Sequence, residues 1–274
     1  MTIRTPLMNV MTAAARKASR NLRRDFVEVE ALQVSRKGPA DFVTTADERV
    51  ENALFGELSR ARPGFGFLME ERGAVAGTDA SHRWIVDPVD GTTNFIHGLP
   101  HFAISIALEK DGQLIAGLVF NPLTDEMFVA ERGQGAWLNG TRLRVSAREH
   151  LADALFATGI PFKGKPGHAR FSAELAEVAD KVAGIRRFGS AALDLAYVAA
   201  GRFDGFWERD LKAWDIAAGI VLVREAGGLV SDIAGGERML SDGVIVAANP
   251  SLHDPLRQLL HGVRADDAGA AREG

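Results

Sequence analysis

The chain contains no cysteine, which excludes disulfide bonds, thiolate metal sites and cysteine nucleophiles. No apolar stretch approaches the length needed to span a membrane. The basic residues near the N-terminus are not followed by an apolar core with a cleavage site. An excess of positive charge is also lacking, because the formal net charge is −4, and this argues against nucleic acid as the direct substrate. We therefore expect a cytoplasmic protein without a membrane partner.

The composition is that of an ordinary globular protein, with 46% hydrophobic and 25% charged residues in a chain of 274. Over residues 1–148, helical patterns give way to alternating strands and tight turns such as Asp111-Gly112, which predicts an α+β half with an antiparallel sheet. Over residues 149–264, short strands alternate with helices, which predicts an α/β half. Residues 265–274 are expected to form a disordered tail.

The first 60 residues predict two helices joined by a loop. Apolar residues recur at helical spacing from Pro6 to Arg24. Residues 34–43 are polar and contain Gly and Pro, so we expect a loop there. Thr45 precedes Glu48 by three residues, which is the pattern of a capping box at the start of the second helix.

A short apolar run at residues 84–86 predicts a buried strand that ends on a carboxylate. Asp87 and Asp90 lie three residues apart, and Pro88 stiffens the turn between them. Gly91 then allows a close approach of the backbone. Taken alone, this pattern is equally typical of an ordinary Asx-type turn at the end of a strand.

Further acids follow other predicted elements. Glu70 and Glu71 end a second apolar strand, and Asp215 falls in the first turn of a helix. Singly, these are typical of a solvated strand end and of an acid that the helix dipole favours. Together with Asp87 and Asp90 they would repel one another unless a cation lay between them. Oxygen ligands without His or Cys suit Mg²⁺ rather than Zn²⁺.

Three separate motifs then resemble the inositol monophosphatase family over about residues 5–260. They are Glu70-Glu71, the segment 87–95, and the segment 214–219 with 225–228. The sequence Thr93-Asn94-Phe95 within the second motif is similar to the inositol monophosphatase branch rather than to the nucleotide or histidinol-phosphate branches. The resemblance implies an α/β fold, a layered α-β-α-β-α sandwich of the inositol monophosphatase and sugar phosphatase type.

The resemblance also implies a set of metal ligands and catalytic residues. Glu70, Asp87 and the Val89 carbonyl would hold one Mg²⁺, while Asp87, Asp90 and Asp215 would hold a second. A weaker third ion would lie near Glu70, so two to three ions are expected in each site. Thr92, supported by Glu70 and Asp47, would orient or deprotonate the attacking water, and no phosphoenzyme is required.

The substrate contacts implied by the resemblance are Asp90, Gly91, Thr92, Gly189, Ser190, Ala191, Glu208 and Lys212. Glu208 has an alternative interpretation as an exposed acid at the end of a strand. Lys212 departs from the His that animal enzymes place at the comparable position, so recognition of the leaving group is open there. Lys37 resembles the mobile-loop lysine of the family, although Arg36 is an alternative for that role. His97 and His101 lie near the motif, and we expect structural or solvent-facing roles for them.

The sequence is therefore interpreted as a Mg²⁺-dependent phosphomonoesterase that hydrolyses myo-inositol monophosphates, is sensitive to lithium and forms a homodimer. A fructose-1,6-bisphosphatase or a broader sugar-phosphate phosphatase is the nearest alternative. An alternative from another class is a partner of RNA polymerase or of antitermination factors, since some bacterial relatives of the family have that role and Arg residues such as Arg16, Arg20 and Arg187 offer a surface. Intact metal-ligand positions favour such a role in addition to hydrolysis.

Overall fold

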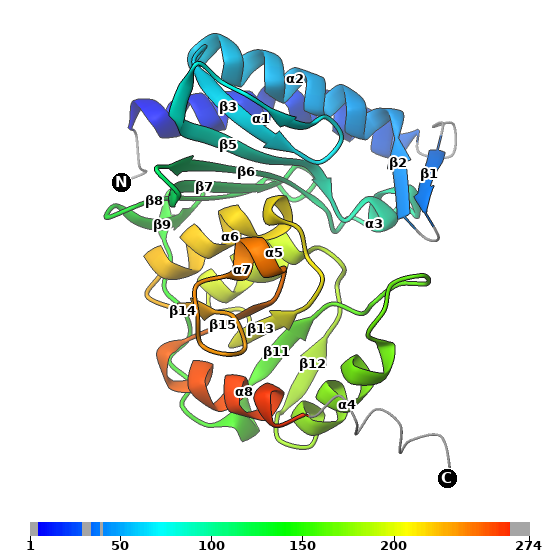
Figure 1. Cartoon of the computed structure of the whole chain (residues 1–274), viewed down its shortest axis with the longest axis vertical. Helices are drawn as coiled ribbons and strands as arrows, with labels where there is room; N and C mark the ends of the chain where they lie inside the picture. Colours follow the sequence, from blue (N-terminus) through cyan, green and yellow to red (C-terminus); the bar gives the residue numbers. More distant parts are fainter. Residues whose placement is uncertain (1–4, 29–33, 39–40, 264–274) are drawn as a thin grey trace.

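The structure is a computed structural model that describes residues 5–28, 34–38 and 41–263, with side chains for 5–28 and 44–263. Five layers are stacked along its long axis (Figure 1): a pair of helices, a large sheet, a second pair of helices, a smaller sheet, and a final pair of helices. This arrangement confirms the predicted layered α-β-α-β-α sandwich. The predicted tail at 265–274 lies outside the described residues.

Helices occur in both halves of the chain. Their bounds are α1 (Pro6–Val27), α2 (Thr45–Ala61), α3 (Thr92–Ile96), η2 (Leu151–Asp153, 3₁₀), α4 (His168–Ala179), α5 (Ala191–Ala199), α6 (Ala213–Glu225), α7 (Met239–Asp242) and α8 (Pro250–Gly262). Among the described residues, no helix combines the length and apolar character needed to cross a membrane.

The large sheet has eight strands in the order β10-β9-β8-β7-β6-β5-β3-β4. Its strands are β3 (Phe65–Met69), β4 (Gly73–Val75), β5 (Asp79–Asp90), β6 (Ala103–Lys110), β7 (Gln113–Asn121), β8 (Glu126–Glu131), β9 (Gly135–Leu138) and β10 (Thr141–Arg142). All neighbours are antiparallel except β3 and β5, which run parallel. The parallel pair brings the carboxyl ends of β3 and β5 to the same edge of the sheet.

The smaller sheet has five strands in the order β12-β11-β13-β15-β14. Its strands are β11 (Leu155–Thr158), β12 (Gly184–Arg186), β13 (Gly205–Glu208), β14 (Leu229–Ser231) and β15 (Ile245–Ala248). The strands β11, β12 and β13 are parallel, and β15 is antiparallel to both β13 and β14. The parallel strands are separated in the sequence by crossover helices, α4 between β11 and β12 and α5 between β12 and β13.

Three apolar cores join the layers. One lies between α1, α2 and the large sheet and contains Met11, Leu54 and Trp84. The central core contains residues of both sheets and of the buried helices α5 and α6. The third packs α8 and α4 against the smaller sheet. Because α5 and α6 have a sheet on each side, they are apolar on most of their surface, whereas α1 shows a single buried stripe.

Two local expectations near the N-terminus were wrong. The predicted loop at residues 34–43 contains an antiparallel hairpin of β1 (Val34–Gly38) and β2 (Asp41–Thr44), whose backbone pairing is compatible with polar side chains. The capping box of α2 begins one residue earlier than predicted. The hydroxyl of Thr44 accepts from the backbone N–H of Asp47, and the Asp47 carboxylate accepts from the backbone N–H of Thr44 at 2.9 Å.

Candidate active site

The site begins where β5 leaves the core. Pairing between β5 and β6 runs in regular register up to Asp87 opposite Ser105, and then jumps to Asp90 opposite Ala103. One extra residue in β5 is therefore accommodated as a bulge. Pro88 has no N–H to donate to the neighbouring strand, so the irregularity sacrifices no hydrogen bond from this residue. The bulge changes the direction of the end of the strand and leaves Asp87 and Asp90 close together.

Asp215 joins these two acids from the other half of the chain. Carboxylate oxygens of Asp87, Asp90 and Asp215 all lie within 4.8 Å of one another. Glu70, directly after β3, lies close to Asp87: after burial, the charge of Glu70 is the next cause that raises the pKa of Asp87, and a side-chain hydrogen bond between the two acids acts in the same direction. The four predicted ligand side chains are thus brought to one place from three elements. Glu71 lies apart from the three-acid group, and its backbone N–H donates to Glu51 at 2.8 Å.

The packing of α6 against its neighbours explains the position of Asp215. A Cβ on Gly219 would lie 2.5 Å from the side chain of Leu195, so glycine lets α6 pack closely against α5. The Ser105 hydroxyl donates to the Trp214 carbonyl at 3.2 Å and ties the first turn of α6 to β6. The backbone N–H of Lys212 then donates to Asp215 Oδ2 at 2.7 Å and orients the carboxylate.

Asp90 is held by the segment that precedes and begins α5. Its Oδ2 accepts from the Ser190 hydroxyl and from the backbone N–H of Ala192, the latter at 2.8 Å. Ser190 also caps α5, since its Oγ accepts from the backbone N–H of Leu193. One side chain therefore links the helix start of the second half to an acid of the first half.

Thr92 is placed between a carboxylate and a carbonyl. Its Oγ1 lies 3.1 Å from Asp47 Oδ1 and 3.0 Å from the Val89 carbonyl oxygen, and the hydroxyl can donate its one proton to either. The second oxygen of Asp47 is engaged by the Thr44 backbone N–H and hydroxyl. Asp47 is thus fixed in position by the start of α2, and its other oxygen, Oδ1, faces Thr92.

The buried acids raise one another's pKa. Burial, followed by the charge of neighbouring acids, raises the pKa of Asp215 to about 7 and that of Asp87 well above its usual value. Burial also raises the pKa of Asp90 to about 6, although Ser190 and the backbone around Ala192 oppose it. Burial raises the pKa of Asp47 to about 6. Such a group of carboxylates is costly to ionise without a counter-charge.

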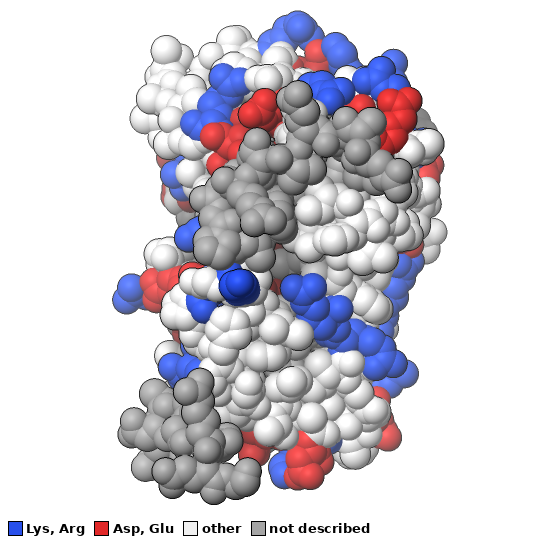
Figure 2. Space-filling view, turned by 90° about the vertical axis from the view of Figure 1, so that its right-hand side faces the viewer, with Lys and Arg blue, Asp and Glu red and all other residues white. Residues whose placement is uncertain are grey.

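A cavity of about 240 Å³ opens beside these acids. Its lining includes Glu70, Asp90, Gly91, Thr92, Gly189, Ala191 and Asp215, together with Gly159, Phe162, Lys165, Arg170, Arg187, Glu208 and Arg209. Figure 2 shows the corresponding face hollowed between the upper and lower halves, with Lys and Arg side chains gathered below the hollow. The cavity therefore combines the acid cluster with a rim that carries several cations.

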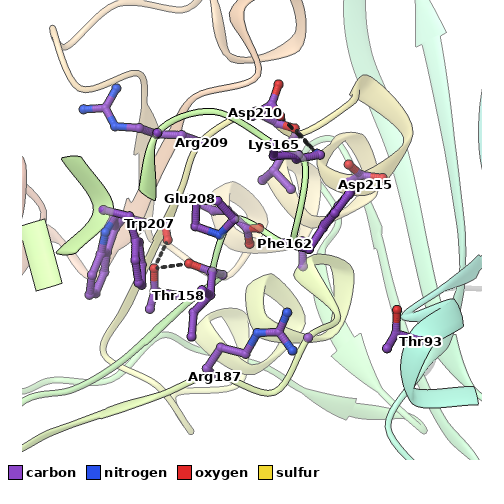
Figure 3. Close-up of a pocket in the computed structure, with 18 of the residues that line it drawn as sticks. Thr93, Thr158, Phe162, Lys165, Arg187, Trp207, Glu208, Arg209, Asp210 and Asp215 are labelled. Carbon is purple, nitrogen blue, oxygen red and sulfur yellow. Dashed lines mark hydrogen bonds and ion pairs between the residues drawn. The ribbon is translucent and has the colours of Figure 1, made fainter. Parts of the chain in front are cut away.

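Glu208 lies at the end of β13 with its carboxyl group over Gly159. A Cβ at Gly159 would lie 1.9 Å from that carboxyl group, so only glycine leaves room for it. Burial, and then the charges of Asp215 and Asp90, raise the pKa of Glu208 to about 8. Figure 3 shows Glu208 between Phe162, Arg187 and Asp215. Its placement in the cavity argues against the alternative of an exposed strand-end acid.

Some predicted site residues do not line the cavity, and others have side chains that lie outside the described residues. The Lys212 side chain is exposed and does not line the cavity, although its backbone holds Asp215. Lys37 and Arg36 are on β1, but their side chains lie outside the described residues. His101 is partly buried beside Phe188, with a burial-lowered pKa of about 4. This packing agrees with the structural role expected for His101.

The residues that sequence reasoning missed come mainly from the segment after β11. Phe162 and Lys165 belong to it, and Lys165 lies 3.1 Å from the Asp210 carboxylate and 4.7 Å from the ring centre of Phe162. Arg170 and Arg209 both contact the buried Glu174. The available signal was a Gly- and Pro-containing loop directly after a buried strand, a position where binding residues are common.

We expect Glu208→Gln to flatten the pH dependence of stability in the presence of EDTA. Between about pH 4.5 and 8, Glu208 is protonated in the folded state and ionised in the unfolded state. The folded state therefore binds more protons, and the free energy of unfolding falls as the pH rises through this window. Thermal unfolding at stepwise pH should show a smaller fall in Tm for the variant. Glu177→Gln, an exposed acid on α4, should keep the wild-type slope, and an unchanged slope in Glu208→Gln would contradict the assignment.

The donor set fits a hard divalent cation. It consists of the clustered carboxylates of Asp87, Asp90 and Asp215, and Cys is absent from the chain. Burial, and then repulsion between the acids, raise the pKa of Asp87 and Asp215, and a bound cation would offset both effects. Oxygen donors, mutual proximity and elevated pKa values all point to the same kind of ligand.

Comparison with known proteins adds the evolutionary context. The family model described as the inositol monophosphatase family matches residues 4–265. The inositol-1-monophosphatase of Mesorhizobium japonicum is 58% identical over 261 residues, covering 95% of this chain and 97% of the relative. The Nus factor SuhB of Escherichia coli K12 is 46% identical over 245 residues, covering 89% and 92%.

Among solved structures, the extragenic suppressor protein suhB from Bartonella henselae superposes with a TM-score of 0.92 at 56% identity, covering 94% of this chain and 99% of that chain. The matched region includes every described element from α1 to α8. The acids that converge at the ends of β3 and β5 and at the start of α6 lie inside it. This chain therefore belongs to the inositol monophosphatase family.

Proposed function

We propose that the protein is a Mg²⁺-dependent phosphomonoesterase that hydrolyses myo-inositol monophosphates to inositol and phosphate. The observation that carries the proposal is the convergence of Asp87, Asp90 and Asp215 within 4.8 Å beside the Thr92–Asp47 pair. The 58% identical relative bears the name inositol-1-monophosphatase, which supports this substrate class. Hydrolysis of a phosphate ester needs charge neutralisation and an aimed water, and these residues can supply the sites for both.

The proposed ligand sets divide the acids between two ions. Glu70, Asp87 and the Val89 carbonyl would hold one Mg²⁺, Asp87, Asp90 and Asp215 would hold a second, and a third and weaker ion would lie near Glu70. When bound, Mg²⁺ lowers the pKa of a coordinated water and neutralises charge on the phosphate and on the leaving oxygen. The residues 1–148 would contribute most of the ligands, and the residues 149–264 would complete the set through Asp215.

Thr92 and Asp47 are proposed to orient the attacking water and to accept its proton. The Thr92 hydroxyl can pass its own proton to Asp47 Oδ1, 3.1 Å away, while it accepts a proton from water on the other side. A carboxylate whose pKa is raised to about 6 is well matched to proton transfer near neutral pH. The Thr44 contacts keep Asp47 in the orientation that this transfer requires.

The substrate would lie across the cavity, with its phosphate near the backbone N–H groups of Gly91 and Thr92. Gly189 and Ala191 also line the cavity, and Glu208 can accept hydrogen bonds from polyol hydroxyls. Ser190 would act through Asp90, to which its hydroxyl is bonded. We propose only an indirect role for Lys212, through the backbone bond that orients Asp215.

Thr92→Ala is expected to lower kcat by about 10²-fold or more, because the acceptor that aims the water is lost. Thr92→Ser keeps the hydroxyl next to Asp47 and the Val89 carbonyl, and should keep most of the activity. Steady-state kinetics on inositol 1-phosphate at saturating Mg²⁺ would test this. Equal losses in the alanine and serine variants would refute a role for the hydroxyl.

The substrate assignment is tested by a comparison of kcat/KM across phosphate esters. Inositol 1-phosphate should give the highest value among inositol 1-phosphate, fructose 1,6-bisphosphate, histidinol phosphate and 3′-phosphoadenosine 5′-phosphate. A higher value for fructose 1,6-bisphosphate would favour the sugar-phosphate alternative.

A second candidate function is an association with the transcription machinery, and it rests on the 46% identical relative named a Nus factor. We propose that such a role, and a homodimer, would be additional to hydrolysis, because the candidate metal ligands are intact here. An Asp90→Asn protein should retain any such partner while losing hydrolysis, since Asp90 is buried at the acid cluster and not on the surface.

A further inference from the structure

Asn94 lies where three backbone carbonyl groups converge. Its Nδ2 is 2.7 Å from the His101 oxygen, 2.7 Å from the Phe188 oxygen and 3.4 Å from the Gly189 oxygen, and the residue is only 6% exposed. Carbonyl oxygens can only accept, so the amide nitrogen, and not the amide oxygen, must face them. Both protons of the NH₂ group are committed to the two short bonds.

These bonds join segments that belong to different halves of the chain. Asn94 is in α3, two residues after Thr92, whereas Phe188 and Gly189 lead into α5. Two glycines make the approach possible. A Cβ on Gly91 would lie 3.2 Å from the Gly189 oxygen, and a Cβ on Gly189 would lie 3.3 Å from Asn94 Nδ2. Both glycines also have positive φ values, of 98° and 83°, which other residues rarely adopt.

The same segment holds an acid of the site. Ser190 follows Gly189 directly, and its hydroxyl and the backbone N–H of Ala192 are the donors to Asp90 Oδ2. Asp90 is on β5 in the large sheet, while its donors belong to the helix layer of the other half. The distance between them therefore depends on where residues 188–190 sit, and Asn94 is the side chain that bonds this segment to α3.

We propose that Asn94 is a positioning residue for hydrolysis: it sets the segment 188–190 so that Ser190 and Ala192 orient Asp90 within the acid cluster. This inference rests on the proposed phosphatase function. Asn94 does not line the cavity, so its effect passes through Asp90 and not through contact with the substrate. Small displacements of a catalytic group are sufficient to lower the rate strongly.

The test is Asn94→Asp, which keeps the shape of the side chain but turns two donors into an acceptor facing three carbonyl oxygens. We expect kcat to fall by about 10–100-fold and the half-activating Mg²⁺ concentration to rise, with a smaller change in KM for inositol 1-phosphate. Backbone hydrogen exchange at Ala192, and calorimetric titration with Mn²⁺, supply readouts that do not depend on turnover. Faster exchange and weaker Mn²⁺ binding are expected. Asn94→Ala serves the same purpose if the aspartate variant does not fold.

A matched control is Asn249→Asp in the other half. Asn249 is also buried, and its Nδ2 donates to Ser146 Oγ at 2.8 Å and to the Arg148 carbonyl at 3.0 Å, away from the cavity. This change also removes two donor bonds, while the acceptor that caps α8 remains. It should lower Tm but leave kcat and the Mg²⁺ dependence of the folded protein unchanged.

A double-mutant cycle separates positioning from general destabilisation. If Asn94 acts through Ser190, the losses in Asn94→Asp and Ser190→Ala will be strongly non-additive. The proposal is overturned by wild-type kcat and Mg²⁺ dependence in Asn94→Asp, by additive losses, or by an equal loss in Asn249→Asp. Failure of the wild-type protein to hydrolyse inositol 1-phosphate would instead overturn the proposed function. Weaker Mn²⁺ binding by Asn94→Asp would still support the positioning role in that case.

Discussion

Asp90→Asn is expected to lower kcat for inositol 1-phosphate by about three orders of magnitude or more, since the loss of the charge of a proposed metal ligand would remove several kcal/mol of transition-state stabilisation. The amide keeps the size of the carboxylate and can still accept from the Ala192 backbone N–H. The fold should therefore persist. Far-UV circular dichroism and steady-state kinetics on the same preparations would establish both results.

Although Asp90→Asn should lower activity, it should not lower stability when metal is absent. Burial and neighbouring acids raise the pKa of Asp90 to about 6, so its charge is unfavourable in the metal-free fold near neutral pH. In EDTA at pH 7.5, the Tm of Asp90→Asn should equal or exceed that of the wild type. Asp204→Asn, which changes a buried acid of the smaller-sheet half that accepts from the Leu155 backbone N–H, should keep activity and lose stability. Full turnover by Asp90→Asn would refute the proposed metal-dependent mechanism.

Removal of divalent cations should abolish hydrolysis completely, and Mg²⁺ should restore it. Without a counter-charge, Asp87, Asp90 and Asp215 lie within 4.8 Å of one another and repel. Mg²⁺ that binds only the folded state should also raise Tm in a concentration-dependent way. Parallel titrations of activity and Tm after treatment with EDTA would show both effects at similar Mg²⁺ concentrations.

Calcium provides the sharpest contrast in that experiment. Ca²⁺ accepts more ligands at longer distances than Mg²⁺, so it should raise Tm by occupying the acid cluster while it inhibits turnover. Full activity with Ca²⁺ would show that the proposed ligand geometry is wrong. Activity that survives exhaustive chelation would exclude a metal requirement altogether. Inhibition by Li⁺ is expected as well, through competition for a Mg²⁺ position.

Much of the site could be predicted from short segments of sequence. The run of apolar residues before Asp87 and the similar run before Glu70 predicted two strands ending on acids. The structure has β5 continuing past Asp87 to Asp90, and β3 ending at Met69, one residue before Glu70. These predictions succeed because strand formation and the chemistry of a turn depend on neighbouring residues. The same local logic was less successful at residues 34–43, where β1 and β2 pair with each other despite a polar sequence.

Bonds between distant segments could not be predicted in this way. The capping box of α2 was displaced by one residue, and Asp47 proved to connect α2 with Thr92. In the sequence, Asn94 was notable only as part of the motif Thr93-Asn94-Phe95, yet its amide donates to carbonyl groups that include one 94 residues further along the chain. Such contacts depend on the packing of the layers, which no pattern within a segment encodes.

By itself, the sequence determined the types of chemistry that are available: oxygen ligands without thiolates, acids at the ends of strands and at a helix start, and a threonine beside them. Only the tertiary structure decided which of these groups meet. A β-bulge turns Asp87 and Asp90 together, glycines at 219 and 189 let elements approach, and Ser190 reaches Asp90 across 100 residues of chain. The physical reason is that distances between side chains of separate elements are set by close packing and buried hydrogen bonds, which form only when the whole fold assembles.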